Sequence, residues 1–320
     1  MLARNSVPGL SEGAPLPCGA RVTVVVNRAA RSAERPRWEP LVRKILARRL
    51  SPELAFPDGI AEMTAMVAES GRAGANAIVV AGGDGSLNCV VRALGGRDVP
   101  LALLPLGTAN DLARGLGIPT NVLGAAHRVV DGSLRRLDLL EVNGEPFMTV
   151  GGLGVAADAA LAANRLRRSA HLRRAVGALG TRVYPLAAAA RILLGPAPSH
   201  RVRIGYRDPD GRTHALECAC AALLVANQGS FGAGLVLPTA SRNDDGIFEL
   251  CLVPAGSRPW LLATLAALAR GRAPHLPVVR AREARIATDR PLDFFGDGEE
   301  LVRERTFILR VRPAALGVIC

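Results

Sequence analysis

The feature that most constrains the fold is a series of short apolar runs, each followed by a polar or Gly-rich turn. Such runs stand at residues 21–27, 53–56, 77–81 and 101–105, with helical spacing near 38–50, 58–72 and 86–94. Continuous β-branched and aliphatic runs are typical of strands buried on both faces of a parallel sheet. This part of the chain therefore predicts an α/β domain with an open, mainly parallel sheet, whose loops gather at the carboxyl ends of the strands.

The pattern changes near Leu137, where short strand candidates begin to dominate. They stand at 137–142, 147–152, 201–206, 216–226, 246–253, 280–288, 292–295 and 306–311, with helices expected near 171–194 and 260–270. Short strands separated by turns predict a mainly antiparallel β domain. For a chain of 320 residues we therefore expect a loose leader at 1–19, an α/β domain at 20–135 and a β-rich domain at 136–312. A C-terminal tail at 313–320 can pack back on the first domain.

Composition excludes several mechanisms. Only Lys44 among the 40 basic residues is a lysine, and it lies outside any Gly-rich loop. P-loop nucleotide binding and Schiff-base catalysis both require a lysine, so both classes are excluded. The net charge of +12 favours an anionic partner such as a nucleotide or a membrane surface, and the 3% aromatic content argues against nucleic-acid binding by base stacking. We expect no nucleic-acid partner.

The cysteines and the apolar stretches bear on the cellular compartment. The six cysteines form no C-x-x-C pair, and we interpret them as reduced core residues. The first twenty residues lack the pattern of a signal peptide, and the longest uncharged stretch, 218–241, is interrupted by polar residues and Pro238. We therefore expect a cytoplasmic protein whose membrane contact is peripheral.

Three turns carry the candidate chemistry. The sharpest is Gly82-Gly83-Asp84-Gly85-Ser86, between an apolar run and a helix. Its glycines would let the backbone approach phosphate oxygens beside a helix N-terminus, and Asp84 implies Mg²⁺ because a carboxylate repels phosphate unless a cation intervenes. A strand-to-helix turn with Asp84 as the helix cap is the alternative.

The second turn is Gly107-Thr108-Ala109-Asn110-Asp111, with Arg114 one helical turn further on. In a parallel sheet it would lie beside the first turn and face the same phosphates, although Asp111 as a simple helix cap also fits. The third turn, Asp297-Gly298-Glu299, places two carboxylates after a strand, and by itself it is also an ordinary hairpin turn.

Together these motifs resemble the diacylglycerol kinase catalytic domain family, which includes bacterial lipid kinases, sphingosine kinases and ceramide kinases. The resemblance spans about residues 21–311 and rests on GGDGSLN at 82–88, PLGTANDLAR at 105–114, the stretch 225–250 and DGE at 297–299. NAD kinases share a GGDG turn, but they would not explain the other motifs together. Cys89 stands where the family usually has Glu.

The resemblance implies an ATP- and Mg²⁺-dependent kinase with its active site in the cleft between a nucleotide-binding and a lipid-substrate domain. It assigns ATP and phosphate binding to Asn27, Gly82, Gly83, Asp84, Gly85, Ser86, Gly107, Thr108, Asn110 and Arg114. Asp84, Asn110 and Glu299 would form a network with Mg²⁺, directly or through water. Asp297 would be the base for the hydroxyl of a diacylglycerol-like, sphingoid or ceramide lipid, with Asp84 as the alternative base.

A cationic cluster at 165–174 precedes apolar residues at helical spacing. We expect Arg167, Arg168, Arg173 and Arg174 to contact an anionic membrane at its inner face, and a solvated helix face is the alternative. Two other functions stay open at this point: a NAD-kinase-like phosphotransferase acting on a soluble substrate, and a catalytically silent nucleotide- or lipid-binding module. A homodimer is compatible with all three.

Overall fold

The chain divides into two structural units. The computed structural model describes residues 11–27, 38–168, 179–232, 234–272 and 274–320. The first unit comprises Met1–Leu137 and Ala314–Cys320, and the second comprises Asp138–Pro313. The chain therefore passes between the units twice, after residue 137 and after residue 313.

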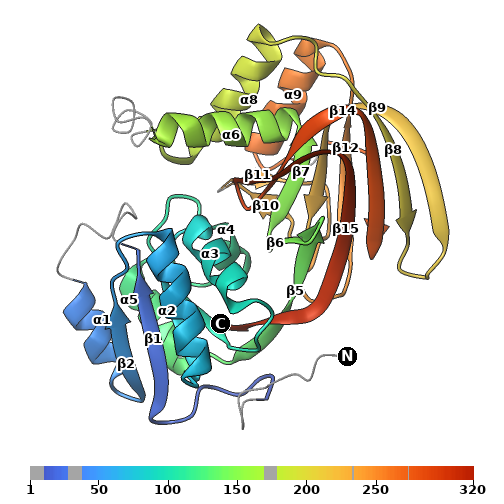
Figure 1. Ribbon diagram of the computed structural model, residues 1–320. Helices are drawn as coiled ribbons and strands as arrows, with labels where there is room; N and C mark the ends of the chain where they lie inside the picture. The colour runs from blue at the N-terminus through green and yellow to red at the C-terminus, as the bar shows by residue number, and fades with distance from the viewer. Residues whose placement is uncertain (1–10, 28–37, 169–178, 233, 273) are drawn as a thin grey trace. The chain divides into compact units, whose positions relative to one another are not determined.

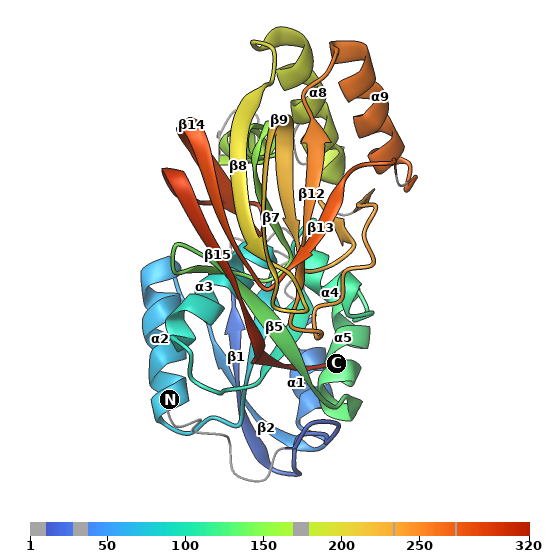
Figure 2. The same cartoon turned by 90° about the vertical axis from the view of Figure 1, so that its right-hand side faces the viewer.

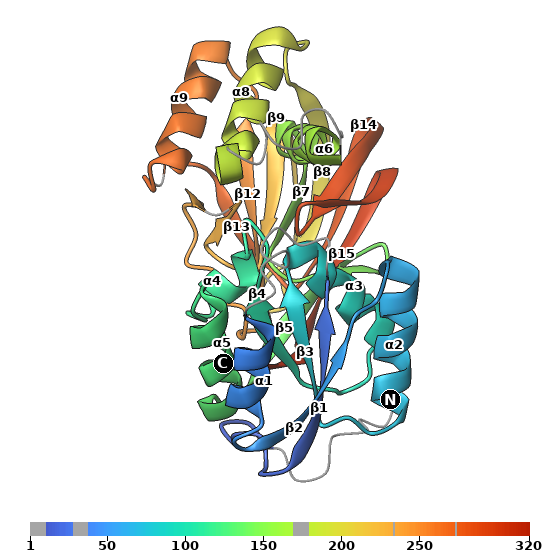
Figure 3. The ribbon, with the colours of Figure 1, turned by 90° about the vertical axis from the view of Figure 1, so that its left-hand side faces the viewer.

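The first unit is a parallel sheet with helices on both faces (Figure 1, Figure 3). In spatial order its strands are β2 (Leu50–Ala55), β1 (Ala20–Val26), β3 (Ala77–Gly82), β4 (Leu101–Pro105) and the end of β15 (Glu299–Ile319). Helices α1 (Glu39–Leu46) and α5 (Val122–Asp131) cover one face, and α2 (Ile60–Arg72) and α3 (Asp84–Leu94) cover the other. The short helix α4 (Asp111–Gly115) follows β4. This is the α/β arrangement that the sequence predicts.

Burial explains which strands are central. β3 and β4 are buried along their whole length, as expected for strands covered by helices on both faces. Among the described strands β2 pairs with β1 alone, Leu50 is its one buried residue, and it contains Pro52. Proline lacks the N–H group that a second neighbour would need, so it is tolerated on such an edge strand.

The described part of the predicted leader is packed rather than loose. Leu16 is buried, and the N–H group of Gly13 donates to the carbonyl oxygen of Leu134 at 2.8 Å. The N–H group of Leu134 donates in turn to Ala14 at 2.8 Å. Residues 11–19 therefore belong to the first unit, because their backbone and Leu16 find partners there.

The second unit is built from antiparallel strands and three long helices. Its elements are β5 (Leu134–Val142), β6 (Glu145–Phe147), β7 (Val150–Gly154), α6 (Val155–Arg168), the 3₁₀ turn η1 (Gly180–Arg182), α8 (Val183–Leu194), β8 (His200–Arg207), β9 (Thr213–Ala226), β10 (Ser230–Phe231), β11 (Leu235–Val236), β12 (Phe248–Pro254), α9 (Arg258–Ala269), β13 (Val278–Ala281), β14 (Glu283–Gly296) and most of β15. The strand pairs described within this unit are antiparallel, as predicted.

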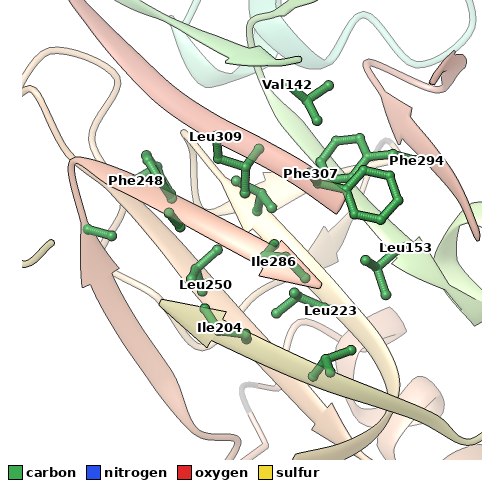
Figure 4. Close-up of a cluster of buried hydrophobic side chains, with 14 of the residues drawn as sticks. Val142, Leu153, Ile204, Leu223, Phe248, Leu250, Ile286, Phe294, Phe307 and Leu309 are labelled. Atoms are coloured by element: carbon green, nitrogen blue, oxygen red, sulfur yellow. The ribbon is translucent and has the colours of Figure 1, made fainter. Parts of the chain in front are cut away.

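The core of the second unit lies between its strands (Figure 4). Phe294 packs against Phe147 and Phe307, with ring centroids 5.8 and 5.5 Å apart. The other face of β9 is covered by α6, α8 and α9, through residues such as Ala188 and Leu261. The second half of β9 is therefore buried on both faces, whereas its first half is largely accessible.

Several elements of the second unit differ from the sequence prediction. Helix α6 was not predicted, although its Ala-rich sequence has high helix propensity. The strands predicted at 280–288 and 292–295 are mostly parts of one long strand, β14. The strand predicted at 147–152 is interrupted at Met148 and Thr149, because their N–H groups bind a side chain instead of a neighbouring strand.

Candidate functional site

The two Gly-rich turns of the first unit touch backbone to backbone. β3 and β4 are neighbours, and Gly82 pairs with Pro105 at their carboxyl ends. A Cβ atom added to Gly107 would lie 2.5 Å from the Cα atom of Gly83, and one added to Gly83 would lie 3.0 Å from the Cα atom of Gly107. Glycine is therefore required at both positions for the turns to meet. The sequence interpretation explains these glycines by the approach of phosphate alone.

Asp84 ties the first turn to the second. It is the first residue of α3, whose N-cap is Gly83, so Asp84 does not cap its own helix. Its Oδ1 atom accepts a hydrogen bond of 2.8 Å from the N–H group of Asp111, the first residue of α4. A carboxylate at the start of each helix is favoured by the helix dipole, and the two carboxyl-bearing residues stand in directly neighbouring turns.

Asn110 holds the second turn in shape. It adopts a left-handed conformation with φ of 50°, which asparagine tolerates better than most residues. Its Oδ1 atom accepts a 3.0 Å hydrogen bond from the N–H group of Gly107, and its Nδ2 atom donates a 3.0 Å bond to the Gly107 carbonyl oxygen. Asn110, rather than Asp111, is the N-cap residue of α4.

The other predicted phosphate-binding residues surround these turns. Asn27 follows β1, and its Nδ2 atom donates a 2.8 Å hydrogen bond to Oγ of Ser86. Gly85 lies in the first turn of α3, and Thr108 is partly buried. The exposed Arg114 donates from Nε to the carbonyl oxygen of Ala109 at 2.9 Å. The first unit therefore brings Asn27, the GGDGS turn and the GTAND turn together.

The donor set of these turns fits a cation only in part. Mg²⁺ is typically bound by one or two carboxylates together with substrate phosphate oxygens. Asp84 and Asp111 can supply carboxylate oxygens, whereas the amide of Asn110 is used in the turn. Among the described residues there is no cluster of three or more His, Cys, Asp or Glu side chains that could hold a metal ion. The residues therefore fit Mg²⁺ that arrives with a phosphate, and Asn110 is better explained as a loop residue.

In the second unit, Asp297 and Gly298 form the two-residue turn between β14 and β15. Both have positive φ angles, 52° and 83°, and Gly296 pairs with Glu299 across the hairpin. Such a turn favours the Asp-Gly sequence. The hairpin interpretation of this motif is therefore correct. It explains the backbone of Asp297 and Gly298, whereas the role of the Asp297 carboxylate depends on its contacts.

The carboxylate of Asp297 is held by several donors. Its Oδ1 atom accepts hydrogen bonds from the N–H group and the hydroxyl of Thr149, at 2.8 and 2.7 Å. Its Oδ2 atom accepts from the N–H group of Met148 at 2.9 Å. These donors stabilise the carboxylate anion and fix its orientation. They also explain why the predicted strand at 147–152 is interrupted.

Asn227 supports the same segment from behind. This asparagine is fully buried, and its Nδ2 atom donates to the carbonyl oxygens of Met148 and Asp138, at 2.8 and 3.0 Å. Its N–H group donates to Thr149 at 2.8 Å. The motif at 225–250 contains Asn227, but the sequence interpretation gives no role to Asn227 or Thr149. The position of Asn227 directly after an apolar run could have indicated a buried polar residue.

The predicted membrane-contacting arginines are only partly described. The guanidinium of Arg167 donates to the hydroxyl of Tyr184 at 2.7 Å and to the carbonyl oxygen of Gly180 at 3.2 Å, and it also lies over the Tyr184 ring. Arg167 thus joins α6 to α8. Arg168 ends α6 and its side chain is not described, while Arg173 and Arg174 lie outside the described residues.

The comparisons with known proteins agree with the sequence resemblance. Residues 21–142 match the family described as "Diacylglycerol kinase catalytic domain", and residues 150–320 match the "YegS C-terminal NAD kinase beta sandwich-like domain". A "Probable lipid kinase YegS-like" from Pseudomonas aeruginosa is 32% identical over 305 residues, which is 93% of each chain. A "Diacylglycerol kinase" from Mycobacterium tuberculosis is 30% identical over 254 residues, 77% of each chain.

A solved structure shares the fold. A putative diacylglycerol kinase from Bacillus anthracis superposes with a TM-score of 0.76, covering 95% of this chain and 98% of that chain at 19% identity.

Proposed function

Because this chain belongs to the diacylglycerol kinase catalytic domain family and is a lipid kinase, we propose that it transfers the γ-phosphoryl group of ATP to a hydroxyl of a diacylglycerol-like or sphingoid lipid. The observation that carries this proposal is the contact between the GGDGS and GTAND turns at the carboxyl ends of β3 and β4. Ligands of open α/β sheets bind at such strand ends. The two turns would hold the phosphates of ATP.

The turns would act mainly by positioning and by their charges. Helix α3 begins at the first of these turns, and the N–H groups at a helix N-terminus attract phosphate oxygens. The cavity beneath the turns is about 20 Å³, which is room for about one water molecule, so the phosphates would bind outside it. Mg²⁺, held by Asp84 and by phosphate oxygens, would neutralise the charge that develops during transfer.

Asp297 is the proposed partner of the lipid hydroxyl. Its carboxylate is fixed by Met148 and Thr149, and a fixed carboxylate can orient a hydroxyl and accept its proton as the new O–P bond forms. Because these donors hold the carboxylate in one orientation, orienting the hydroxyl is expected to be its larger contribution. Glu299, two residues on, is proposed to belong to the Mg²⁺ network.

The test is a substrate panel with matched variants. Purified protein is incubated with γ-labelled ATP, Mg²⁺ and separately diacylglycerol, sphingosine, ceramide or NAD. We expect label in one lipid, and label in NAD alone would favour the NAD-kinase-like alternative. Asp297→Asn is expected to lower turnover ~10²–10⁴-fold with little change in ATP affinity, because the carboxylate acts on the lipid hydroxyl.

Asp293→Asn is the matched control. Asp293 lies on the same hairpin, where it pairs with Arg303 at 2.8 Å. We expect this variant to keep its turnover. Equal losses in both variants would mean that the hairpin, rather than the Asp297 carboxylate, matters.

The lipid substrate leads to a proposed location. None of the helices in the described ranges is both long enough and apolar enough to cross a bilayer. We propose that the enzyme reaches its substrate by peripheral binding to the cytoplasmic face of the membrane.

A further inference from the structure

Helix α8 exposes apolar side chains along one face. The exposed fractions are 53% for Leu186, 50% for Leu193 and 86% for Leu194. Spacings of seven and eight residues place these three leucines on the same side of a helix. The neighbouring helix α9 exposes Trp260, at 41%. The two helices lie side by side in Figure 2 and Figure 3 and pack against one another.

The opposite face of α8 is already used by the core. Val183, Ala188 and Ile192 are buried there. Within α8 the one charged side chain is Arg191, and its Nε atom is paired with Asp158 at 2.7 Å. A surface helix of a globular protein normally turns polar residues outward. Both faces of α8 are instead apolar, so its outer face is built to contact something other than water.

The sequence around this face is rich in arginine, and the acidic residue beside α8, Asp158, is paired with Arg191. Residues 159–207 and 250–282 contain no Asp or Glu, although the average of 28 acidic residues in 320 would place about seven there. The same two segments contain fifteen arginines. Four of these arginines are paired with carboxylates, namely Arg191, Arg203, Arg207 and Arg280. Arg165 and Arg182 are exposed on α6 and η1, and Arg258 begins α9. Apolar side chains surrounded by arginine are typical of surfaces that bind anionic lipid.

A second copy of the chain fits this face less well. A two-fold dimer would bring the same patch of each copy together, and with it the same arginines. Like charges across an interface repel. An anionic bilayer, by contrast, satisfies both the leucines and the arginines.

The same helix reaches the turn that carries Asp297. Tyr184, in the first turn of α8, has its hydroxyl 3.7 Å from the position of a Cβ atom added to Gly298. Asn164 of α6 donates from Nδ2 to the carbonyl oxygen of Gly298. The outer face of α8 and the Asp297 turn are therefore connected through this one helix.

We propose that Leu186, Leu193, Leu194 and Trp260 insert into an anionic lipid leaflet, an assignment that rests on the lipid kinase function proposed above. Arg165 and Arg182 contact the lipid headgroups. Arg167 has a different task, since its contacts with Tyr184 and Gly180 hold α6 against α8. The proposed surface is centred on α8, and it adds apolar side chains to the membrane contact that the sequence predicts for arginines of residues 165–174.

The test measures binding to vesicles of phosphatidylglycerol and phosphatidylcholine without ATP. The triple variant Leu186→Gln, Leu193→Gln, Leu194→Gln is expected to lower the partition constant about tenfold or more, because three apolar side chains leave the acyl region. The double variant Leu41→Gln, Ile60→Gln is the control, since these side chains are 50% and 69% exposed on α1 and α2. We expect the control to bind as the unchanged protein does.

Tryptophan fluorescence gives a second readout. The chain has two tryptophans, and Trp38 is buried while Trp260 is exposed. Brominated phospholipids in the vesicles are expected to quench the emission, and Trp260→Phe is expected to remove the quenching. Unchanged partition of the triple variant, or quenching that survives Trp260→Phe, would overturn the assignment. So would a dimer that the triple variant converts to monomers, because the face would then bind a second copy.

A kinase assay separates this assignment from the proposed function. It uses a water-soluble short-chain diacylglycerol, for which no membrane is needed. The triple variant is expected to keep its activity in that assay and to lose activity on vesicles. Leucine-dependent vesicle binding by a protein that phosphorylates none of the lipids would refute the proposed substrate alone. Activity with unaltered binding by the triple variant would refute the α8 surface alone.

Discussion

Gly107→Ala tests whether the GGDGS and GTAND turns depend on close backbone contact. The added Cβ atom would lie 2.5 Å from Cα of Gly83 and 2.7 Å from Oδ1 of Asn110. Ordinary carbon contacts are about 3.5–4.0 Å, so the turns would have to separate by roughly 1 Å. Backbone cannot rotate out of the way as a side chain can.

The separation has an expected cost in stability and in catalysis. Overpacking of this kind lowers the free energy of unfolding by about 1–3 kcal/mol, which lowers the melting temperature by roughly 2–10 °C in a protein of this size. A displacement of about 1 Å in a positioning element can reduce catalysis ~10²-fold. We therefore expect kcat/KM for ATP to fall by one to two orders of magnitude.

Gly71→Ala is the matched control. Gly71 lies within α2, and a Cβ atom there would meet its nearest neighbours at 3.7–3.8 Å, an ordinary contact. Replacing glycine by alanine inside a helix stabilises by about 0.5–1 kcal/mol, so this variant should melt at a higher temperature. Thermal melts and ATP titrations of both variants decide the question. Similar melting temperatures and ATP kinetics for the two variants would show that the turns do not meet as described.

Three further outcomes are expected. Thr149→Val removes the 2.7 Å hydrogen bond from the Thr149 hydroxyl to Asp297 and should lower kcat about tenfold at unchanged KM for ATP. Thr149→Ser should restore kcat, and an unchanged kcat in the valine variant would show that this hydrogen bond does not contribute to catalysis. Asp84→Ala and Glu299→Ala should each raise the Mg²⁺ concentration for half-maximal activity, and a double variant with the full product of both effects would place them in separate networks. Burial, aided by the Arg290 guanidinium, lowers the pKa of His200 below its usual 6.5. The imidazole of His200 is therefore protonated at a higher pH in the unfolded chain than in the folded chain. The stability that His200 contributes is therefore complete above about pH 6.5 and is lost as pH falls through the folded-state pKa. The midpoint of urea unfolding should drop between pH 7.5 and 5.5. An equal drop in the His200→Gln variant would show that other groups cause the pH dependence.

The sequence alone determined the parts of this protein that depend on neighbouring residues. Apolar runs that are buried on both faces identified β3 and β4, and Asp-Gly identified the turn at Asp297. Both signals are local, since they reflect the preference of a few consecutive residues for one backbone conformation. The motifs at 82–88 and 105–114 were equally readable, because their residues are adjacent in the chain.

Only the tertiary structure decided what the motif residues contact. Asp84 binds the N–H group of Asp111, and Asp297 binds Met148 and Thr149, partners that are 27 to 149 positions away. Leucine is usually a core residue, yet Leu194 of α8 is 86% exposed. A local pattern shows that a residue is apolar or charged, but the partner it meets depends on which strands and helices become neighbours. The packing of the whole unit determines which elements are neighbours. These neighbours decide whether a carboxylate caps a helix, binds the N–H groups between two strands or contacts a substrate.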